Sequence, residues 1–131
     1  MTNIDRFNEC AAKLFSRLYA EFPKPCGVNY FEFLGKDVFE AGDDELEFCR
    51  ATLEWLENAG YITVDAHSND CAYNVVLTAK GLETLKAVPD SLKGKGSIGD
   101  AMVAAVKAGS IEMAKQLASK AFTEGFKLIG L

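Results

Sequence analysis

The sequence predicts an α+β fold, and residues 43–89 carry most of that prediction. Apolar side chains recur at helical spacing over residues 43–59, and from Tyr61 onward the pattern changes to the alternation of a strand. A second alternating run follows a short polar turn, and helical spacing returns after Thr78. A helix, two strands joined by a short turn and another helix indicate a small antiparallel sheet packed against helices.

Length and composition set the scale of the fold. The chain has 131 residues, of which 49% are hydrophobic, enough for one core, so we expect one domain and an appendage. The N-terminal MTNIDRFNEC has no apolar run before its first charges, and a signal peptide is not expected. No stretch approaches the roughly 20 apolar residues of a membrane-spanning helix. We therefore expect a cytoplasmic protein.

The first ninety residues divide at their prolines and glycines. Residues 3–22 predict an amphipathic helix that begins with a capping pair, Thr2 and Asp5, and ends before Pro23. Val28 is placed to start a short strand. Residues 30–34 predict a short helix whose aromatic rings pack inward, with a ligand pocket as the less common alternative.

The helix on which the rest of this region is organised spans residues 43–59, with Asp43 or Asp44 as its cap and Gly60 at its end. Its apolar stripe is wide and comprises Leu46, Cys49, Leu53 and Leu56, flanked by Phe48, Thr52, Trp55 and Ala59. In the strands that follow, we expect two sets of residues each to share a face, namely Ile62, Val64 and Ala66, and Tyr73, Val75 and Leu77.

This order resembles a winged helix-turn-helix domain over about residues 4–89. The resemblance rests on the helix ending LEWLENAGYI, the strand pair after it and the LTAKGLETL that follows. It implies a three-helix core with a two- or three-stranded antiparallel wing. The same scaffold carries DNA readers, RNA readers and protein-contact modules, so the resemblance implies binding without naming the partner.

The C-terminal part predicts a separate helical segment. We expect a domain over residues 1–90, a linker over 91–97 and a helical segment over 98–131 that begins with a capping pair, Ser97 and Asp100. A continuous helix would be about 48 Å long. The segment therefore either bends near Gly109 into a helical hairpin or projects from the domain.

Small residues four apart in this segment allow two helix backbones to approach closely, within the chain or between chains. From them we predict a self-association face that makes a homodimer, comprising Ala105, Gly109, Ala114, Leu117, Ala118, Ala121, Phe122 and Gly125. Binding of this helix to a membrane surface is a rival interpretation. The mixed charge of its polar face disfavours it.

Charge is unevenly distributed along the chain. The formal net charge is -5; residues 1–90 hold 8 basic and 16 acidic side chains, and residues 91–131 hold 6 basic and 3 acidic. This asymmetry favours a tail that docks on the acidic domain of its own chain or of a neighbour.

DNA-binding members of the winged-helix fold place the second helix of the turn motif in the major groove and neutralise phosphates with Lys or Arg. The outward positions of the matching helix here are Glu47, Arg50, Glu54, Glu57 and Asn58, of which Arg50 alone is basic. We predict that this face binds a protein partner. A DNA-binding transcriptional regulator is the alternative, although the charge disfavours nucleic acid.

Catalytic and metal-binding patterns are weak in this sequence. The four cysteines are widely spaced with no C-x-x-C pair, and His67 is the single histidine, so the ligand pattern of a zinc site is missing. We therefore expect the cysteines to be small buried side chains in a reducing compartment. The glycines of LKGKGSIGD do not follow a strand, so they match no nucleotide-binding loop. We expect a protein without catalytic activity, metal or cofactor.

Overall fold

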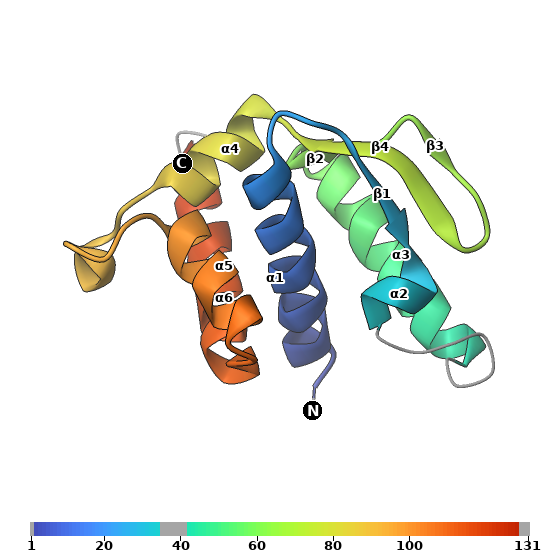
Figure 1. Cartoon of the computed structure of the whole chain (residues 1–131), viewed down its shortest axis with the longest axis horizontal. Coiled ribbons are helices and arrows are strands. Elements are labelled where there is room, and N and C mark those ends of the chain that lie inside the picture. Colours follow the sequence, from blue (N-terminus) through green and yellow to red (C-terminus); the bar gives the residue numbers. More distant parts are fainter. Residues whose placement is uncertain (1, 35–41, 129–131) are drawn as a thin grey trace.

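The computed structural model describes residues 2–34 and 42–128, which form helices and a small open antiparallel sheet in an α+β arrangement (Figure 1). Its elements in chain order are α1 (Asn3–Glu21), β1 (Cys26–Asn29), α2 (Tyr30–Leu34), α3 (Asp43–Asn58), β2 (Ile62–Thr63), β3 (Ala66–His67), β4 (Cys71–Leu77), α4 (Ala79–Lys86), a single 3-10 turn (Asp90–Leu92), α5 (Ile98–Lys107) and α6 (Ile111–Leu128).

The helix starts follow local signals in the sequence. The Thr2 hydroxyl accepts a hydrogen bond from the Asp5 amide and the Asp5 carboxylate accepts one from the Thr2 amide, which confirms the predicted capping pair. Ser97 and Asp100 do the same for α5. At α3 the prediction was wrong, because Gly42 takes the cap position and the aspartates lie in the first turn. There their charge suits the positive end of the helix dipole.

Strand β4 is the centre of the sheet. It pairs antiparallel with β1, and also with β2 and β3, so the predicted strand pair and the predicted strand at Val28 are confirmed. Cys26 lies opposite Val75 and Val28 opposite Ala72, a shift of register that marks a bulge in β4.

The bulge corrects the predicted strand face. Within it Asn74 has a φ of 52°, in the left-handed region. Because the extra residue reverses the alternation, Tyr73 is 46% exposed while Ala72, Val75 and Leu77 are buried. Tyr73 therefore does not share a face with Val75 and Leu77 as predicted. In the preceding strands Ile62 is buried, Val64 is half-buried and Ala66 is exposed.

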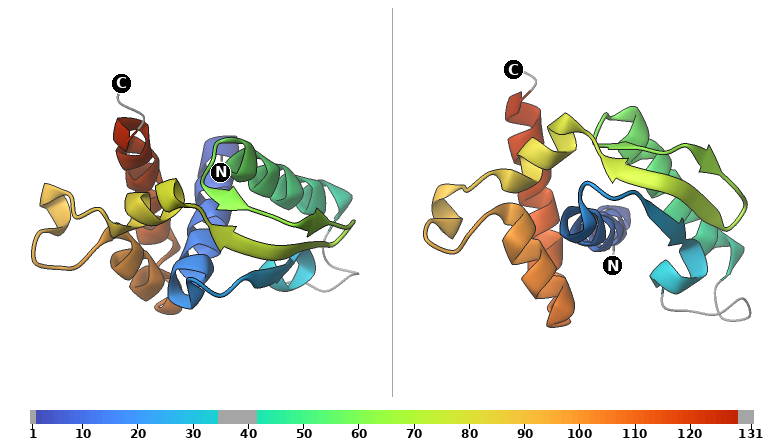
Figure 2. Two further views of the ribbon diagram at one scale, coloured as in Figure 1. Left: turned by 90° about the horizontal axis from the view of Figure 1, so that it is seen from above. Right: turned by 45° about the horizontal axis from the view of Figure 1, so that its top comes forward.

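Helix α1 lies in the middle of the molecule, with α5 and α6 on one side and α3 with the sheet on the other (Figures 1 and 2). A single apolar core runs through these layers. It includes Phe15 of α1, Leu53 of α3, Met102 of α5 and Ala118 of α6. The predicted linker at 91–97 thus does not separate two cores, and the segment from residue 98 packs onto α1.

The C-terminal segment is a helical hairpin. Gly109 has a φ of 74° between α5 and α6, so the chain bends there, one of the two arrangements expected from the sequence. The predicted self-association face lies inside this fold: Ala105, Ala114, Leu117, Ala118, Ala121 and Gly125 are buried, Phe122 is half-buried against the core, and Gly109 is exposed at the bend. The small residues therefore serve a contact within the chain, and this face is not available to a second copy.

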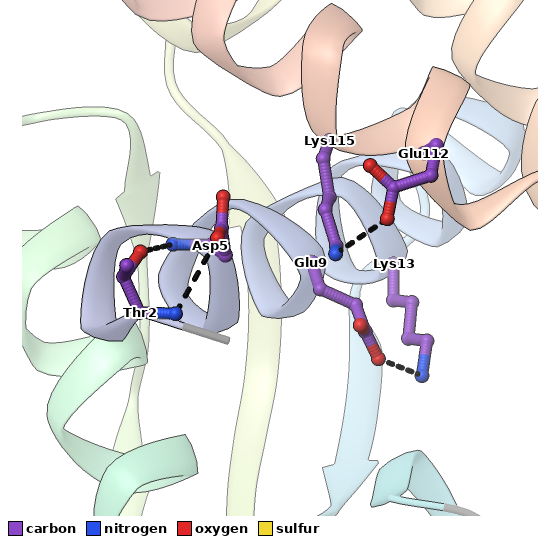
Figure 3. A network of polar contacts seen from close by, with 6 residues as sticks. All are labelled: Thr2, Asp5, Glu9, Lys13, Glu112 and Lys115. Carbon is purple, nitrogen blue, oxygen red and sulfur yellow. Dashed lines mark hydrogen bonds and ion pairs between the residues drawn. The ribbon is translucent and has the colours of Figure 1, made fainter.

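One basic side chain of α6 lies near the carboxylates of α1. Lys115, only 8% exposed, reaches from α6 toward the acidic first turns of α1 and donates a 2.9 Å hydrogen bond to Glu112 (Figure 3). That hydrogen bond raises the pKa of Lys115, and the carboxylates of Asp5 and Glu9 raise it further. The hydrogen bond of Lys115 stays within α6, and the contact of α6 with α1 is made by the apolar core.

Candidate functional site

The exposed side of α3 holds the residues predicted to bind a partner. Glu47, Glu54 and Asn58 are exposed, and Arg50 and Glu57 are half-buried. Helix α3 carries one guanidinium and a surplus of carboxylates, from Asp43, Asp44, Glu45, Glu47, Glu54 and Glu57. This acidic row, defined here as Glu47, Glu54 and Glu57, gives the surface a negative potential.

Two members of this side connect α3 to the β3–β4 hairpin. The Arg50 Nη2 donates a 3.2 Å hydrogen bond to the Asn69 carbonyl, and its Nε is buried without a hydrogen-bond partner in the described part of the chain. Glu57 lies 3.1 Å from the His67 Nε2. His67, the single histidine of the chain, is therefore held by α3. Arg50 is already engaged and points its charge at the hairpin.

Beside the acidic row lies a hollow that the sequence did not reveal. This groove between α1 and α3 has a volume of about 370 Å³ and is lined by Asn3, Ile4, Phe7, Phe48, Ala51, Thr52 and Trp55. Ile4 is 68% exposed and Trp55 is 51% exposed. Ile4 and Phe7 belong to the amphipathic helix predicted over residues 3–22, and Phe48 and Trp55 were predicted to flank the apolar stripe of α3. The apolar stripe of α3 is wider than one packing contact covers, and this width was the only signal in the sequence that part of it stays exposed.

The groove and the acidic row form one continuous surface, called the α3 face below. Ala51 is four residues from Glu47 and three from Glu54, and Trp55 is three residues from Asn58, so these side chains are neighbours on the helix surface.

Aromatic contacts fix the floor of the groove. The Trp55 ring packs edge-on against Phe7, with centroids 5.3 Å apart, and against Phe122, with centroids 5.9 Å apart. At the rim, the Arg6 guanidinium lies 4.0 Å from the centre of the Phe48 ring and 3.7 Å from the Asp44 carboxylate. The indole is therefore exposed but held in place by its neighbours.

Behind α3 the reactive side chains are buried, as for Cys49 and Tyr30, or half-buried, as for Cys10. Burial raises the pKa of the Cys49 thiol to about 12 and that of the Tyr30 hydroxyl to about 12, and it also raises the pKa of Cys10. A thiol with such a pKa is protonated near neutral pH and is a poor nucleophile. Over residues 2–34 and 42–128, no three His, Cys, Asp or Glu side chains gather as metal ligands.

Comparisons with known protein families, with curated proteins and with solved structures found no match. None of the helices in the described ranges has both the length and the apolar character needed to cross a bilayer. The geometry and charge of the α3 face are therefore the observations from which function can be argued.

Proposed function

We propose that the protein is a winged-helix module that binds another protein through the α3 face and has no catalytic role. The order of elements supports the winged-helix assignment: α1, β1, α2 and α3 precede the β2–β4 strands, as in the resemblance drawn from the sequence. In that fold α3 corresponds to the helix that DNA-binding members insert into the major groove. The surface of α3 therefore decides which class of partner the module takes.

One observation carries the choice of a protein partner. Glu47 and Glu54 are exposed on α3, and Arg50, the single basic residue of the helix, already bonds to the hairpin. Phosphate contacts supply most of the non-specific affinity of a protein for DNA, and carboxylates at these positions repel phosphate. The groove beside them offers apolar surface, which protein interfaces bury at their centre.

The self-association part of our prediction is not retained, because its residues form the core between α6 and α1. A DNA-binding transcriptional regulator is the second candidate, and the DNA-binding experiment below tests it. Membrane docking through the C-terminal helix is disfavoured, since Ala114, Leu117, Ala118 and Ala121 of its apolar side are buried in the core of the chain.

Variants that reverse charge on and off the α3 face test the proposal. The tagged chain is purified from its native cells as wild type, as Glu47→Lys with Glu54→Lys, and as a control with Glu32→Lys and Glu83→Lys. Both double variants change the net charge equally, and all four residues are exposed. We expect a partner with the wild type and the control that the α3 variant loses, with calorimetry on the purified partner reproducing the difference. Equal recovery by the two double variants would contradict the proposal.

Fluorescence anisotropy with short DNA duplexes of mixed sequence tests the second candidate. In low salt of about 50 mM, where phosphate contacts are strongest, we expect no saturable binding. Saturable binding that weakens steeply with salt, and that Arg50→Glu abolishes, would replace the protein-binding proposal with DNA reading.

A further inference from the structure

The apolar lining and the charged rim of the groove between α1 and α3 indicate which kind of protein segment binds there. We propose that it takes the apolar side of an amphipathic helix rich in lysine or arginine, supplied by the partner. This inference rests on the proposed protein-binding function and names the segment that the α3 face recognises.

The groove offers a preformed seat for apolar side chains. Ile4 and Trp55 each leave more than half of their surface in water, and covering them would remove that apolar area from water, which favours binding. Trp55 is already fixed by Phe7 and Phe122, so little ordering is needed on binding. From Phe48 to Trp55 the groove follows two turns of α3, about 10 Å at 1.5 Å per residue. That length matches the spacing of anchors at positions i, i+3 or i+4, and i+7 of a docked helix.

The rim of the groove sets the charge of the occupant. Glu47 and Glu54 are exposed along one edge of the groove. Arg6 is paired with Asp44 and stacked on Phe48, so its charge is already matched. Cations flanking the apolar stripe of a bound helix would face carboxylates, which favours both encounter and orientation.

The same charges argue against two other occupants. A second copy seated symmetrically would bring its own acidic row close to this one, and like charges brought together oppose association. A lipid surface would cover Ile4 and Trp55 but would bring anionic headgroups to Glu47 and Glu54. A basic amphipathic helix matches the apolar groove and the charged rim together.

The chain carries its own probe of this groove, because Trp55 is its single tryptophan. The full-length protein is titrated with a tryptophan-free model helix of leucine and lysine in an amphipathic pattern. Two matched peptides replace every lysine with glutamate or every leucine with serine. We expect the leucine–lysine peptide to shift the Trp55 emission to the blue with one saturable site. We expect the other two peptides to leave the emission unchanged.

Two substitutions by glutamate distinguish binding in the groove from non-specific attraction of a cationic peptide to the acidic protein. Ile4→Glu changes the groove, and Met113→Glu changes an exposed residue of α6, 53% exposed, that lines a different hollow beside Ser91 and Leu92. We expect Ile4→Glu to weaken binding of the leucine–lysine peptide by about tenfold or more, as for an interface anchor. Met113→Glu should leave it within about twofold. Because both variants add negative charge, binding driven by charge alone would strengthen in each.

Four results would overturn the inference: tight binding of the leucine–glutamate peptide, full binding by Ile4→Glu, a wild-type dimer in sedimentation that Ile4→Glu dissociates, or the same Trp55 shift on phosphatidylcholine vesicles. The last two would name a second copy or a lipid surface as the occupant. Binding of the natural partner to these variants distinguishes this inference from the protein-binding function proposed above. A partner lost with Glu47→Lys and Glu54→Lys but kept by Ile4→Glu would leave the protein-binding function intact and remove the groove from it.

Discussion

Gly125 of α6 lies directly against Tyr61, and Gly125→Ala tests how firmly the C-terminal hairpin is held to the rest of the molecule. A Cβ at this position would lie 2.9 Å from Cε1 and 3.0 Å from Cζ of Tyr61, and nearer still to its hydroxyl oxygen. The Tyr61 ring is 4% exposed, and the rings of Phe15, Trp55 and Phe122 surround it. Tyr61 therefore has no room to retreat, and α6 must move instead.

Two opposing effects decide the size of the change. Replacing glycine by alanine inside a helix favours folding by about 1 kcal/mol. Adding a methyl group to a packed core costs about 1–3 kcal/mol. Because neither ring nor hydroxyl of Tyr61 can yield, we expect the upper part of that range and a net loss of about 1–2 kcal/mol. For a chain of this length the melting temperature should fall by about 4–8 °C.

Thermal unfolding followed by circular dichroism measures this loss. Gly27→Ala in β1 is the control, since a Cβ there would meet no atom within 4 Å, and its melting temperature should stay the same or rise slightly. Adding Tyr61→Phe to Gly125→Ala removes the nearest atom and should recover part of the loss. A Gly125→Ala protein as stable as the wild type would show that α6 is not packed on Tyr61, and would restore the separate C-terminal segment predicted from the sequence.

Two further predictions concern the stability of the core. Gly81→Ala would drive a Cβ into the carbonyl oxygen of Tyr61, which is backbone and cannot rotate away, so it should cost more than Gly125→Ala; a milder loss in urea unfolding would contradict this packing of α4. Burial raises the pKa of Cys49 from 9.0 to about 12, so the unfolded chain releases this proton first and the free energy of unfolding falls as pH rises from 9 to 12, by at most about 1.4 kcal/mol per pH unit. Urea unfolding at a series of pH values should show a shallower fall for Cys49→Ala, and an unchanged slope would contradict the shift.

The local elements were predictable because their signals lie within a few residues. A hydroxyl and a carboxylate three apart identified the starts of α1 and α5, and a glycine at residue 109 marked the bend before α6. The caps and bends follow from hydrogen bonds and backbone geometry inside one segment. No knowledge of the neighbouring segments was needed.

Packing partners were not predictable from the same patterns. Helical spacing of apolar and small residues predicts that a helix face is buried, but it does not predict which segment packs against that face. Ala118 and Ala121 fit a homodimer as well as an internal contact until α1 is seen beside them. Asn74 shows the same limit at smaller scale, since its left-handed conformation reversed the alternation that placed Tyr73 inside.

One part of the candidate site could be predicted from the sequence and the other could not. The acidic row could be predicted, because charge and helical position are properties of the sequence itself. The groove could not, because Ile4 and Trp55 lie at the edges of apolar stripes, and the angle between α1 and α3 decides whether an edge is covered. That angle depends on every layer of the core.

The apolar half of the α3 face gives a second argument against DNA that is independent of charge. The major groove presents little apolar surface beyond the thymine methyl groups, so Ile4 and Trp55 would stay unmatched against a duplex. Arg50 would also have to leave the Asn69 carbonyl before it could reach a phosphate. Removing the carboxylates of Glu47 and Glu54 would therefore end the repulsion without creating a DNA-reading helix. A basic amphipathic helix requires no such rearrangement, because it meets the charges and the groove of α3 where they already lie.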